Sequence, residues 1–206
     1  IIYYSINAAK KSKIFNRIIV STDSIKIKKI SEKFGAEVPF IRPSSLSDDF
    51  TNTIDVLRHA SKFFFNEYKK KFNICCIYPT APLLEVSDLI NSYKKFSSKK
   101  FSFLFSASKF SYPVQRGFYI NKKNYIQMIN KKNYKKRSQD LKNIYHDAGQ
   151  FYWATNESWD KKKQVFDNKS AIHLIPKLRV QDIDTLEDWN DAEKLYKLKN
   201  EKKNKI

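Results

Sequence analysis

The sequence predicts an α/β protein with a doubly wound, mostly parallel sheet and a small β-hairpin insertion. Strand-length apolar runs alternate with helix-period segments through the first half of the chain. The run at 73–78 is continuously apolar after Asn73, as expected for a central parallel strand covered on both faces. The β-branched run at 17–22 leads into a helix through a Ser-Thr-Asp turn, which is half of a βαβ unit.

Size and composition indicate one globular domain. The chain has 206 residues, of which 41% are hydrophobic and 15% aromatic, too many for a disordered chain. No apolar run approaches the roughly 18 residues that cross a membrane, and the first residues show no signal-peptide pattern. Cys75 and Cys76 are neighbours in a strand and face opposite ways, which favours reduced thiols over a disulfide. We therefore expect a soluble, cytoplasmic protein.

The formal net charge of +19 raises an alternative, a basic module that binds nucleic acid or an anionic glycan. The lysines are spread along most of the chain, and no RNP-like, helix-turn-helix or zinc-finger pattern accompanies them. This distribution favours a solvated, lysine-rich surface over a groove that follows phosphates. Steep salt dependence of binding to generic DNA would favour the module.

The first strand and helix place polar residues at a sheet edge. The strand 17–22 ends in Ser21-Thr22-Asp23, Thr22 or Asp23 can cap the next helix, and Gly35 can end that helix. Ligands of open α/β sheets bind at the carboxyl ends of strands, so Ser21, Thr22 and Asp23 lie where a nucleotide is expected. Helix capping alone also explains Asp23.

The next elements extend the alternation. Residues 38–41 are extended and lead into a polar loop, where Arg42 can donate to a phosphate or a base. A helix is expected from 51 to 71. The strand 73–78 follows and ends in the stiff loop Pro79-Thr80-Ala81-Pro82.

The second half begins with a helix at 87–96 and a strand at 102–108. Residues 112–130 then form an insertion with a hairpin, and strands at 151–154 and 171–175 follow. The chain has only three glycines, Gly35, Gly117 and Gly149, and such scarcity suggests that each answers a backbone need.

Two acidic side chains near the C-terminal end form the candidate metal site. Asp182 and Asp184 flank the apolar Ile183, so in an extended segment both carboxylates point to the same side. Mg²⁺ usually takes one or two carboxylates together with substrate phosphates. Thr185 then starts a helix through a Thr-x-x-Asp variant of the capping box. Capping and solvation alone also explain an Asp-x-Asp motif before a helix.

The two ends of the chain also carry predictions. The chain begins Ile1-Ile2-Tyr3-Tyr4, without Met and inside a helix predicted at 2–12, which we interpret as a fragment that lacks its own beginning. Residues 199–206 form a basic tail.

Several motifs, taken in order, resemble the cytidylyltransferases that activate nine-carbon sugar acids. They are Ser21-Thr22-Asp23, the stretch 35–43, Leu46-Ser47-Asp48-Asp49, Tyr78-Pro79-Thr80-Ala81-Pro82 and Gln181-Asp182-Ile183-Asp184. Within this family, the stretches 137–141 and 145–153 look most like the pseudaminic acid cytidylyltransferases.

The resemblance implies a single cytidylyltransferase domain over 1–206 with a nucleotide-diphospho-sugar transferase-like fold. It implies Mg²⁺-dependent joining of CMP from CTP to a nine-carbon sugar acid, with release of pyrophosphate. The family opens with a strand and a phosphate-binding loop, after which this chain starts, so an inactive fragment is a further alternative.

The resemblance also assigns roles to residues. Asp182 and Asp184 are the catalytic residues and hold Mg²⁺. The CTP contacts are Ser21, Thr22, Asp23, Arg42 and Thr80. The sugar contacts are Tyr78, Arg137, Gln139, Asp147 and Gln150, where Asp147 either binds substrate or orients Gln150. The hairpin insertion at 112–130 serves a homodimer.

Overall fold

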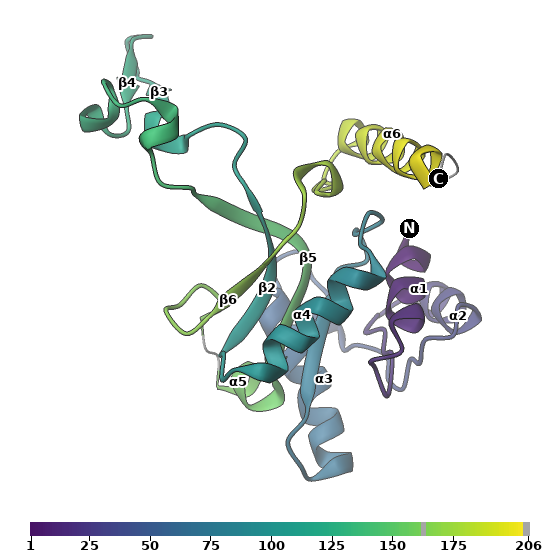
Figure 1. Cartoon of the computed structure of the whole chain (residues 1–206). Helices are drawn as coiled ribbons and strands as arrows, with labels where there is room; N and C mark the ends of the chain where they lie inside the picture. Colours follow the sequence, from purple (N-terminus) through teal and green to yellow (C-terminus); the bar gives the residue numbers. More distant parts are fainter. Residues whose placement is uncertain (162–163, 204–206) are drawn as a thin grey trace.

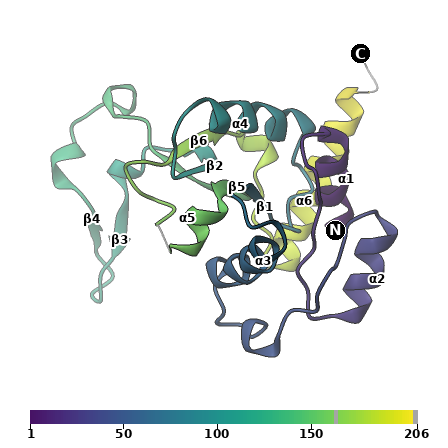
Figure 2. The same cartoon turned by 90° about the horizontal axis from the view of Figure 1, so that it is seen from below.

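The computed structural model describes residues 1–161 and 164–203 as three layers, with helices on both faces of a sheet (Figure 1). The main sheet has the strand order β1-β5-β2-β6, formed by β1 (Asn73–Ile77), β2 (Phe103–Lys109), β5 (Tyr145–Thr155) and β6 (Ala171–Leu174). Helix α4 (Val86–Ser98), with α1 (Ile2–Ser12) beside it, covers one face, and α3 (Thr53–Tyr68) and α5 (Asn156–Asp160) cover the other (Figure 2). The predicted α/β class with helices on both faces is confirmed.

The sheet is mixed. Strands β1, β2 and β6 run in one direction, and β5 lies antiparallel between β1 and β2. The prediction of a central position for 73–78 is wrong within the described residues, because β1 is at the edge of the sheet and pairs only with β5. Its apolar run is explained by packing, since Cys75 and Ile77 face one core cluster and Ile74 and Cys76 the other.

The core has two parts, one on each face of the sheet. Side chains alternate along β5, so Phe151 and Trp153 face α4 while Tyr152 and Ala154 face α3 and α5. The Trp153 indole stacks on Phe15 with 5.4 Å between ring centroids and donates to Ser92 Oγ over 2.9 Å. This buried donor is therefore satisfied, as a core tryptophan requires.

A bulge interrupts the pairing of β2 with β5. Phe105 pairs with Tyr152 but Ala107 pairs with Asp147, so Ser106 faces the intervening residues of β5. Gly149 lies in this bulge with a φ of +61°, a left-handed conformation that glycine adopts without strain. The predicted backbone need is confirmed for Gly149.

The segment 17–22 is not a strand of the sheet, contrary to prediction. It is extended, but it forms one isolated parallel bridge, Ile19 with Glu37. Val20 N donates to Glu37 O over 2.9 Å, and Glu37 N donates to Ile18 O over 2.8 Å. The β-branched run therefore gives an extended backbone without a full ladder.

One helix cap and the bounds of a second helix differ from the predictions. Helix α2 (Ile25–Lys33) is capped by Ser24, whose Oγ accepts from Ile27 N over 3.3 Å, and not by Thr22 or Asp23. Thr22 Oγ1 instead accepts from Ser24 N over 3.1 Å, which shapes the turn before the cap. Helix α3 is capped by Asn52 and ends at Tyr68, inside the predicted range 51–71.

The predicted hairpin is confirmed. It consists of β3 (Phe118–Ile120) and β4 (Ile126–Met128), and it projects away from the main sheet (Figure 1). Short 3-10 segments occur at η1 (Ser44–Leu46), η2 (Val114–Arg116), η3 (Lys131–Asn133), η4 (Ser138–Asp140) and η5 (Lys177–Arg179).

The last helix, α6 (Leu186–Lys203), reaches back toward α1, where Tyr196 lies edge-on to Tyr4 with 5.0 Å between ring centroids. The predicted basic tail thus starts inside α6, and its residues 204–206 lie outside the described residues. No helix in the described ranges is long and apolar enough to span a bilayer.

Candidate functional site

The predicted nucleotide residues around Arg42 lie together. Arg42 N donates to Thr22 O over 2.9 Å, which joins the polar loop to the Ser-Thr-Asp turn. The guanidinium lies 3.4 Å from Ser21 O and 3.5 Å from Asp23 Oδ1. A shorter hydrogen bond, 3.1 Å from Arg42 Nε to Ser47 Oγ, fixes the Nε side of the guanidinium.

This corner retains polar groups that can take a ligand. The contacts of the Arg42 Nη atoms to Ser21 and Asp23 are near the upper limit for hydrogen bonds, so these donors are only weakly engaged. Ser21 Oγ is buried and has no hydrogen-bond partner among the described residues. A phosphate or base acceptor would satisfy such donors.

Tyr78 joins the end of β1 to three other elements. Its backbone N donates to Gln150 O over 2.9 Å, and its backbone O accepts from Ser5 Oγ of α1 over 2.7 Å. Its phenol lies 3.0 Å from Thr53 Oγ1 at the start of α3. Thr80, in the loop beyond, is half-buried.

The β5 bulge fixes Asp147. Its Oδ1 accepts from Gly149 N over 2.9 Å, and its Oδ2 accepts from the Tyr152 hydroxyl. Burial raises the pKa of Tyr152, and donation to Asp147 raises it further, so the phenol stays protonated. Both Asp147 carboxylate contacts are within β5, and they hold the bulge backbone rather than the Gln150 side chain.

Gln150 is almost fully buried, at 3% exposed. Its Nε2 donates to Arg179 O over 2.5 Å, whereas its Oε1 has no partner in the described part of the chain. An unpaired buried acceptor costs about 1–3 kcal/mol, so Gln150 Oε1 is a candidate acceptor for a substrate donor.

Arg137 and Gln139 lie elsewhere. Both are exposed at η4, in the segment that connects the projecting hairpin to β5. The Arg137 fork binds Asp140, with 2.8 Å between Nε and Oδ2. The structure therefore does not gather them with Tyr78, Asp147 and Gln150 through any hydrogen bond between described residues.

Asp182 and Asp184 are both exposed, while Ile183 between them is half-buried. Neither carboxylate forms a hydrogen bond or an ion pair with another described residue. The predicted cap is confirmed: Asp188 N donates to Thr185 Oγ1 over 3.2 Å, and Thr185 N donates to Asp188 Oδ2 over 2.9 Å.

This donor set fits Mg²⁺ but not a metal that needs a full protein cage. No group of three or more His, Cys, Asp or Glu side chains within 1–161 and 164–203 could enclose an ion. Two free carboxylates suit Mg²⁺, which keeps waters and substrate phosphates in its remaining positions.

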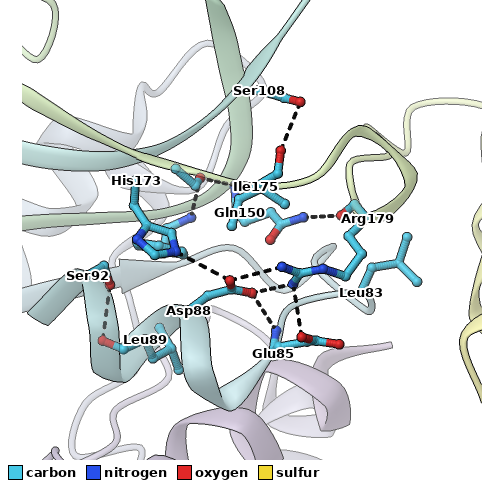
Figure 3. Close-up of polar contacts among 12 residues, drawn as sticks. Leu83, Glu85, Asp88, Leu89, Ser92, Ser108, Gln150, His173, Ile175 and Arg179 are labelled. Carbon is cyan, nitrogen blue, oxygen red and sulfur yellow. Dashed lines mark hydrogen bonds and ion pairs between the residues drawn. The ribbon is translucent and has the colours of Figure 1, made fainter. Parts of the chain in front are cut away.

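A buried ion-pair network behind this segment was missed by the sequence reasoning (Figure 3). Arg179 Nη2 donates to Asp88 Oδ1 over 3.0 Å, and Nη1 contacts Asp88 Oδ2. Nη1 also lies 3.6 Å from Glu85 Oε2, and His173 Nε2 lies 3.3 Å from Asp88 Oδ1. The only local signal was the Glu-x-x-Asp capping pattern of residues 85–88, which the structure realises.

The electrostatics keep Asp88 charged. Burial raises the pKa of its carboxyl, but hydrogen bonds from His173 and Arg179 and the charge of Arg179 outweigh this effect. The pKa of Asp88 falls from 3.8 to about 2. The Asp88–Arg179 pair is therefore fully ionised at neutral pH.

The mixed sheet, covered by helices on both faces, defines a three-layer α/β class of protein. A solved structure of CMP:2-keto-3-deoxy-manno-octonic acid synthetase complexed with CTP is similar, with a TM-score of 0.65 and 11% identity. The alignment covers 98% of this chain and 88% of that chain. At this identity the likeness shows the fold.

Sequence comparisons narrow the class. A family model described as cytidylyltransferase matches residues 1–199. The chain is 40% identical over 201 residues to a pseudaminic acid cytidylyltransferase of Campylobacter jejuni, covering 98% of this chain and 87% of the relative. It is 32% identical over 182 residues to a Helicobacter pylori pseudaminic acid cytidylyltransferase and UDP-2,4-diacetamido-2,4,6-trideoxy-beta-L-altropyranose hydrolase, covering 87% of this chain and 34% of that longer one. The chain belongs to the cytidylyltransferase family, and the predicted resemblance is confirmed.

Proposed function

We propose that the protein joins CMP from CTP to pseudaminic acid, a nine-carbon sugar acid, with Mg²⁺ bound and pyrophosphate released. The observation that carries this proposal is the 40% identity, over nearly the whole chain, to a relative named for that reaction. The second relative, at 32% identity, carries the same activity in its name.

At the nucleotide end, Ser21, Thr22, Asp23, Arg42 and Thr80 bind CTP. The weakly engaged guanidinium of Arg42 supports this role, because its Nη atoms can turn from the long contacts with Ser21 and Asp23 to a phosphate or base oxygen. The unpartnered Ser21 Oγ adds a polar group at the same place.

At the sugar end, Tyr78, Asp147 and Gln150 lie along β5 and the end of β1 and bind the sugar acid. Arg137 and Gln139, which lie apart from them at η4, bind it only if the η4 segment moves toward β5. Gln150 Oε1 is an acceptor without a partner in the described chain, which suits a hydroxyl or amide N–H of the sugar. Arg137 suits the carboxylate of the sugar acid, because a guanidinium binds a carboxylate through two parallel hydrogen bonds. Asp147 and Tyr152 keep the bulge in shape while substrate binds.

The anomeric hydroxyl of the sugar attacks the α-phosphorus of CTP in line with the departing pyrophosphate. Such a step depends on positioning and on neutralisation of charge. Asp182 and Asp184 would hold Mg²⁺, which supplies positive charge to phosphate oxygens. Their freedom from other partners in the described chain supports this role.

The decisive experiment incubates the protein with CTP, pseudaminic acid and MgCl₂. We expect CMP-pseudaminic acid by mass spectrometry and an equal amount of pyrophosphate, and little product when N-acetylneuraminic acid replaces the substrate. EDTA and Asp184→Asn should each abolish product. Asp191→Asn is the charge-matched control, because Asp191 is seven residues from Asp184, inside α6, and pairs only with Lys194 among described residues.

Other outcomes would change the proposal. Full activity in EDTA or in Asp184→Asn would remove the metal role, and preference for another sugar acid would change the substrate. No turnover, together with steep salt-dependent binding to DNA, would favour the basic binding module.

We also propose a cytoplasmic homodimer that forms through the hairpin. The exposed apolar side chains of this insertion support it, since Ile120, Tyr125, Ile126 and Ile129 are each 67–69% exposed. Light scattering after size exclusion should give twice the 24.4 kDa chain mass. Ile126→Asp should give the monomer mass with an unchanged circular dichroism spectrum; a dimer that persists in this variant would place the interface elsewhere.

A further inference from the structure

The segment that carries Asp182 and Asp184 has few hydrogen bonds to the rest of the protein. Within the described chain, the hydrogen bonds of residues 181–184 run only to one another and to Asp188, which follows in α6. The last backbone bond before the segment joins Val180 N to Lys177 O within η5. The place of these carboxylates therefore depends on what holds the two ends of the segment.

The N-terminal end of α4 contacts the chain on both sides of the segment. On the N-terminal side, the Arg179 guanidinium binds Asp88 through two hydrogen bonds and lies 3.6 Å from Glu85 (Figure 3). On the C-terminal side, Lys199 of α6 lies 3.4 Å from Glu85 Oε1 and donates to Leu83 O over 3.2 Å. The N-terminal end of α4 is thus a common anchor.

The Asp88–Arg179 pair is the stronger of the two attachments. Only 6% of the Asp88 side chain and 16% of the Arg179 side chain are exposed. A buried, bidentate ion pair is geometrically specific, and removing one partner leaves an uncompensated charge. His173 on β6 adds a third contact, which ties the Asp88 carboxylate to the sheet.

Arg179 also reaches the sugar side of the site. Its backbone O accepts the Gln150 Nε2 hydrogen bond, so one residue touches the β5 bulge through its main chain and α4 through its side chain. A displacement of Arg179 would therefore move the acidic segment relative to Gln150.

We propose that Asp88, acting through Arg179, is a positioning residue that holds Asp182 and Asp184 in place for the metal. This inference rests on the proposed function, in which the two carboxylates bind Mg²⁺. His173 holds the Asp88 carboxylate in the orientation that Arg179 needs.

The test compares Asp88→Asn and Arg179→Lys with a matched control. Lys95→Met also removes a contact between α4 and β6, the 2.9 Å bond from Lys95 Nζ to Ile172 O, but that contact does not involve Arg179. Two quantities are measured on the full chain with CTP: the affinity for Mn²⁺, by electron paramagnetic resonance, and hydrogen exchange of the hydrogen-bonded amides of residues 179–180.

We expect weaker metal binding and faster exchange in both anchor variants. Loss of groups that orient metal ligands costs roughly 10–100-fold in metal affinity, so the Kd for Mn²⁺ should rise by about 10-fold or more. Exchange of the residue 179–180 amides should accelerate, because their hydrogen bonds to Pro176 O and Lys177 O depend on the place of Arg179, while core strands keep their protection. Lys95→Met should match the wild type in both measurements.

Wild-type Mn²⁺ affinity and exchange in a folded Asp88→Asn or Arg179→Lys protein would overturn the inference. If Asp88→Asn does not fold, Arg179→Lys decides, because it keeps the positive charge and loses only the bidentate geometry. Mn²⁺ binding that requires Asp184 but tolerates both anchor variants overturns this inference alone. Mn²⁺ binding that is absent in the wild type, or unaffected by Asp184→Asn, overturns the metal role in the proposed function and this inference with it.

Discussion

Replacing Ser106 by alanine tests how the β5 bulge is held. Ser106 is 0% exposed, and its Oγ accepts from both Gln150 N and Phe151 N, each over 3.1 Å. Alanine leaves these two amides without a partner at the point where the β2–β5 register shifts. An orphaned buried donor costs about 1–3 kcal/mol, so the free energy of unfolding should fall by about 2–4 kcal/mol.

Ser108→Ala is the matched control on the same strand. Ser108 is 1% exposed and donates one hydrogen bond, to Ile175 O over 3.0 Å, so its loss should cost only about 1 kcal/mol. Urea unfolding followed by circular dichroism gives both values, provided that the slope of the unfolding free energy against urea concentration is the same in the variants and the wild type. Equal losses in the two variants, or a larger loss in Ser108→Ala, would refute the conclusion that the two hydrogen bonds accepted by Ser106 hold the β5 bulge.

Three further predictions concern the acidic network, the bulge glycine and the sugar site. The low pKa of Asp88 stabilises the folded protein above about pH 4, and this contribution is lost as the pH falls to 2. The free energy of unfolding of the wild type, measured by urea titration, should fall by about 2 kcal/mol over this range. An equal fall in Asp88→Asn would contradict this. Gly149→Ala should lower the free energy of unfolding by about 1 kcal/mol, because alanine is strained at a φ of +61°. The added Cβ would meet no atom within 4 Å, so backbone strain is the expected cause. An unchanged urea midpoint would contradict this. Arg137→Ala should raise KM for the sugar acid far more than KM for CTP in steady-state assays, whereas equal changes would move Arg137 out of the sugar site.

Periodicity was sufficient to predict much of the fold. The helix-spaced apolar residues of 87–96 gave α4, and the apolar run at 102–108 gave β2, each within a few residues of the observed bounds. The hairpin and the Thr185 capping box also followed from local patterns, because a turn or a cap involves residues close together in the chain.

The failures concern interactions between distant segments. The direction of β5 and the edge position of β1 depend on which strands pair, and an apolar run does not specify its neighbours. The segment 17–22 has the composition of a strand but only one bridge, because a ladder also needs a partner of matching length. The N-cap of α2 is Ser24 and not Thr22 or Asp23, because residues 22–24 are all good N-cap types and the sequence does not choose among them.

The candidate site shows the same division. Local motifs led to the proposed roles of Ser21, Arg42 and Asp184. Asp88 and Arg179 are 91 residues apart, and neither is unusual in its own sequence context. Charged residues on helices are usually solvated, so nothing in the chain marks Asp88 as buried. Only the fold brings Asp88 against Arg179 of η5, and the proposal for Asp88 rests on that contact.

The three tryptophans differ in exposure, and this difference makes one of them a fluorescent probe of the segment that carries Asp182 and Asp184. Trp153 and Trp159 are each 2% exposed, whereas Trp189, in the first turn of α6, is 46% exposed. An aqueous quencher such as acrylamide should therefore extinguish mainly the Trp189 fluorescence and leave the blue-shifted emission of the other two indoles. Because Trp189 follows Asp184 by five residues in the chain, its quenching should report events at the acidic segment in unlabelled enzyme.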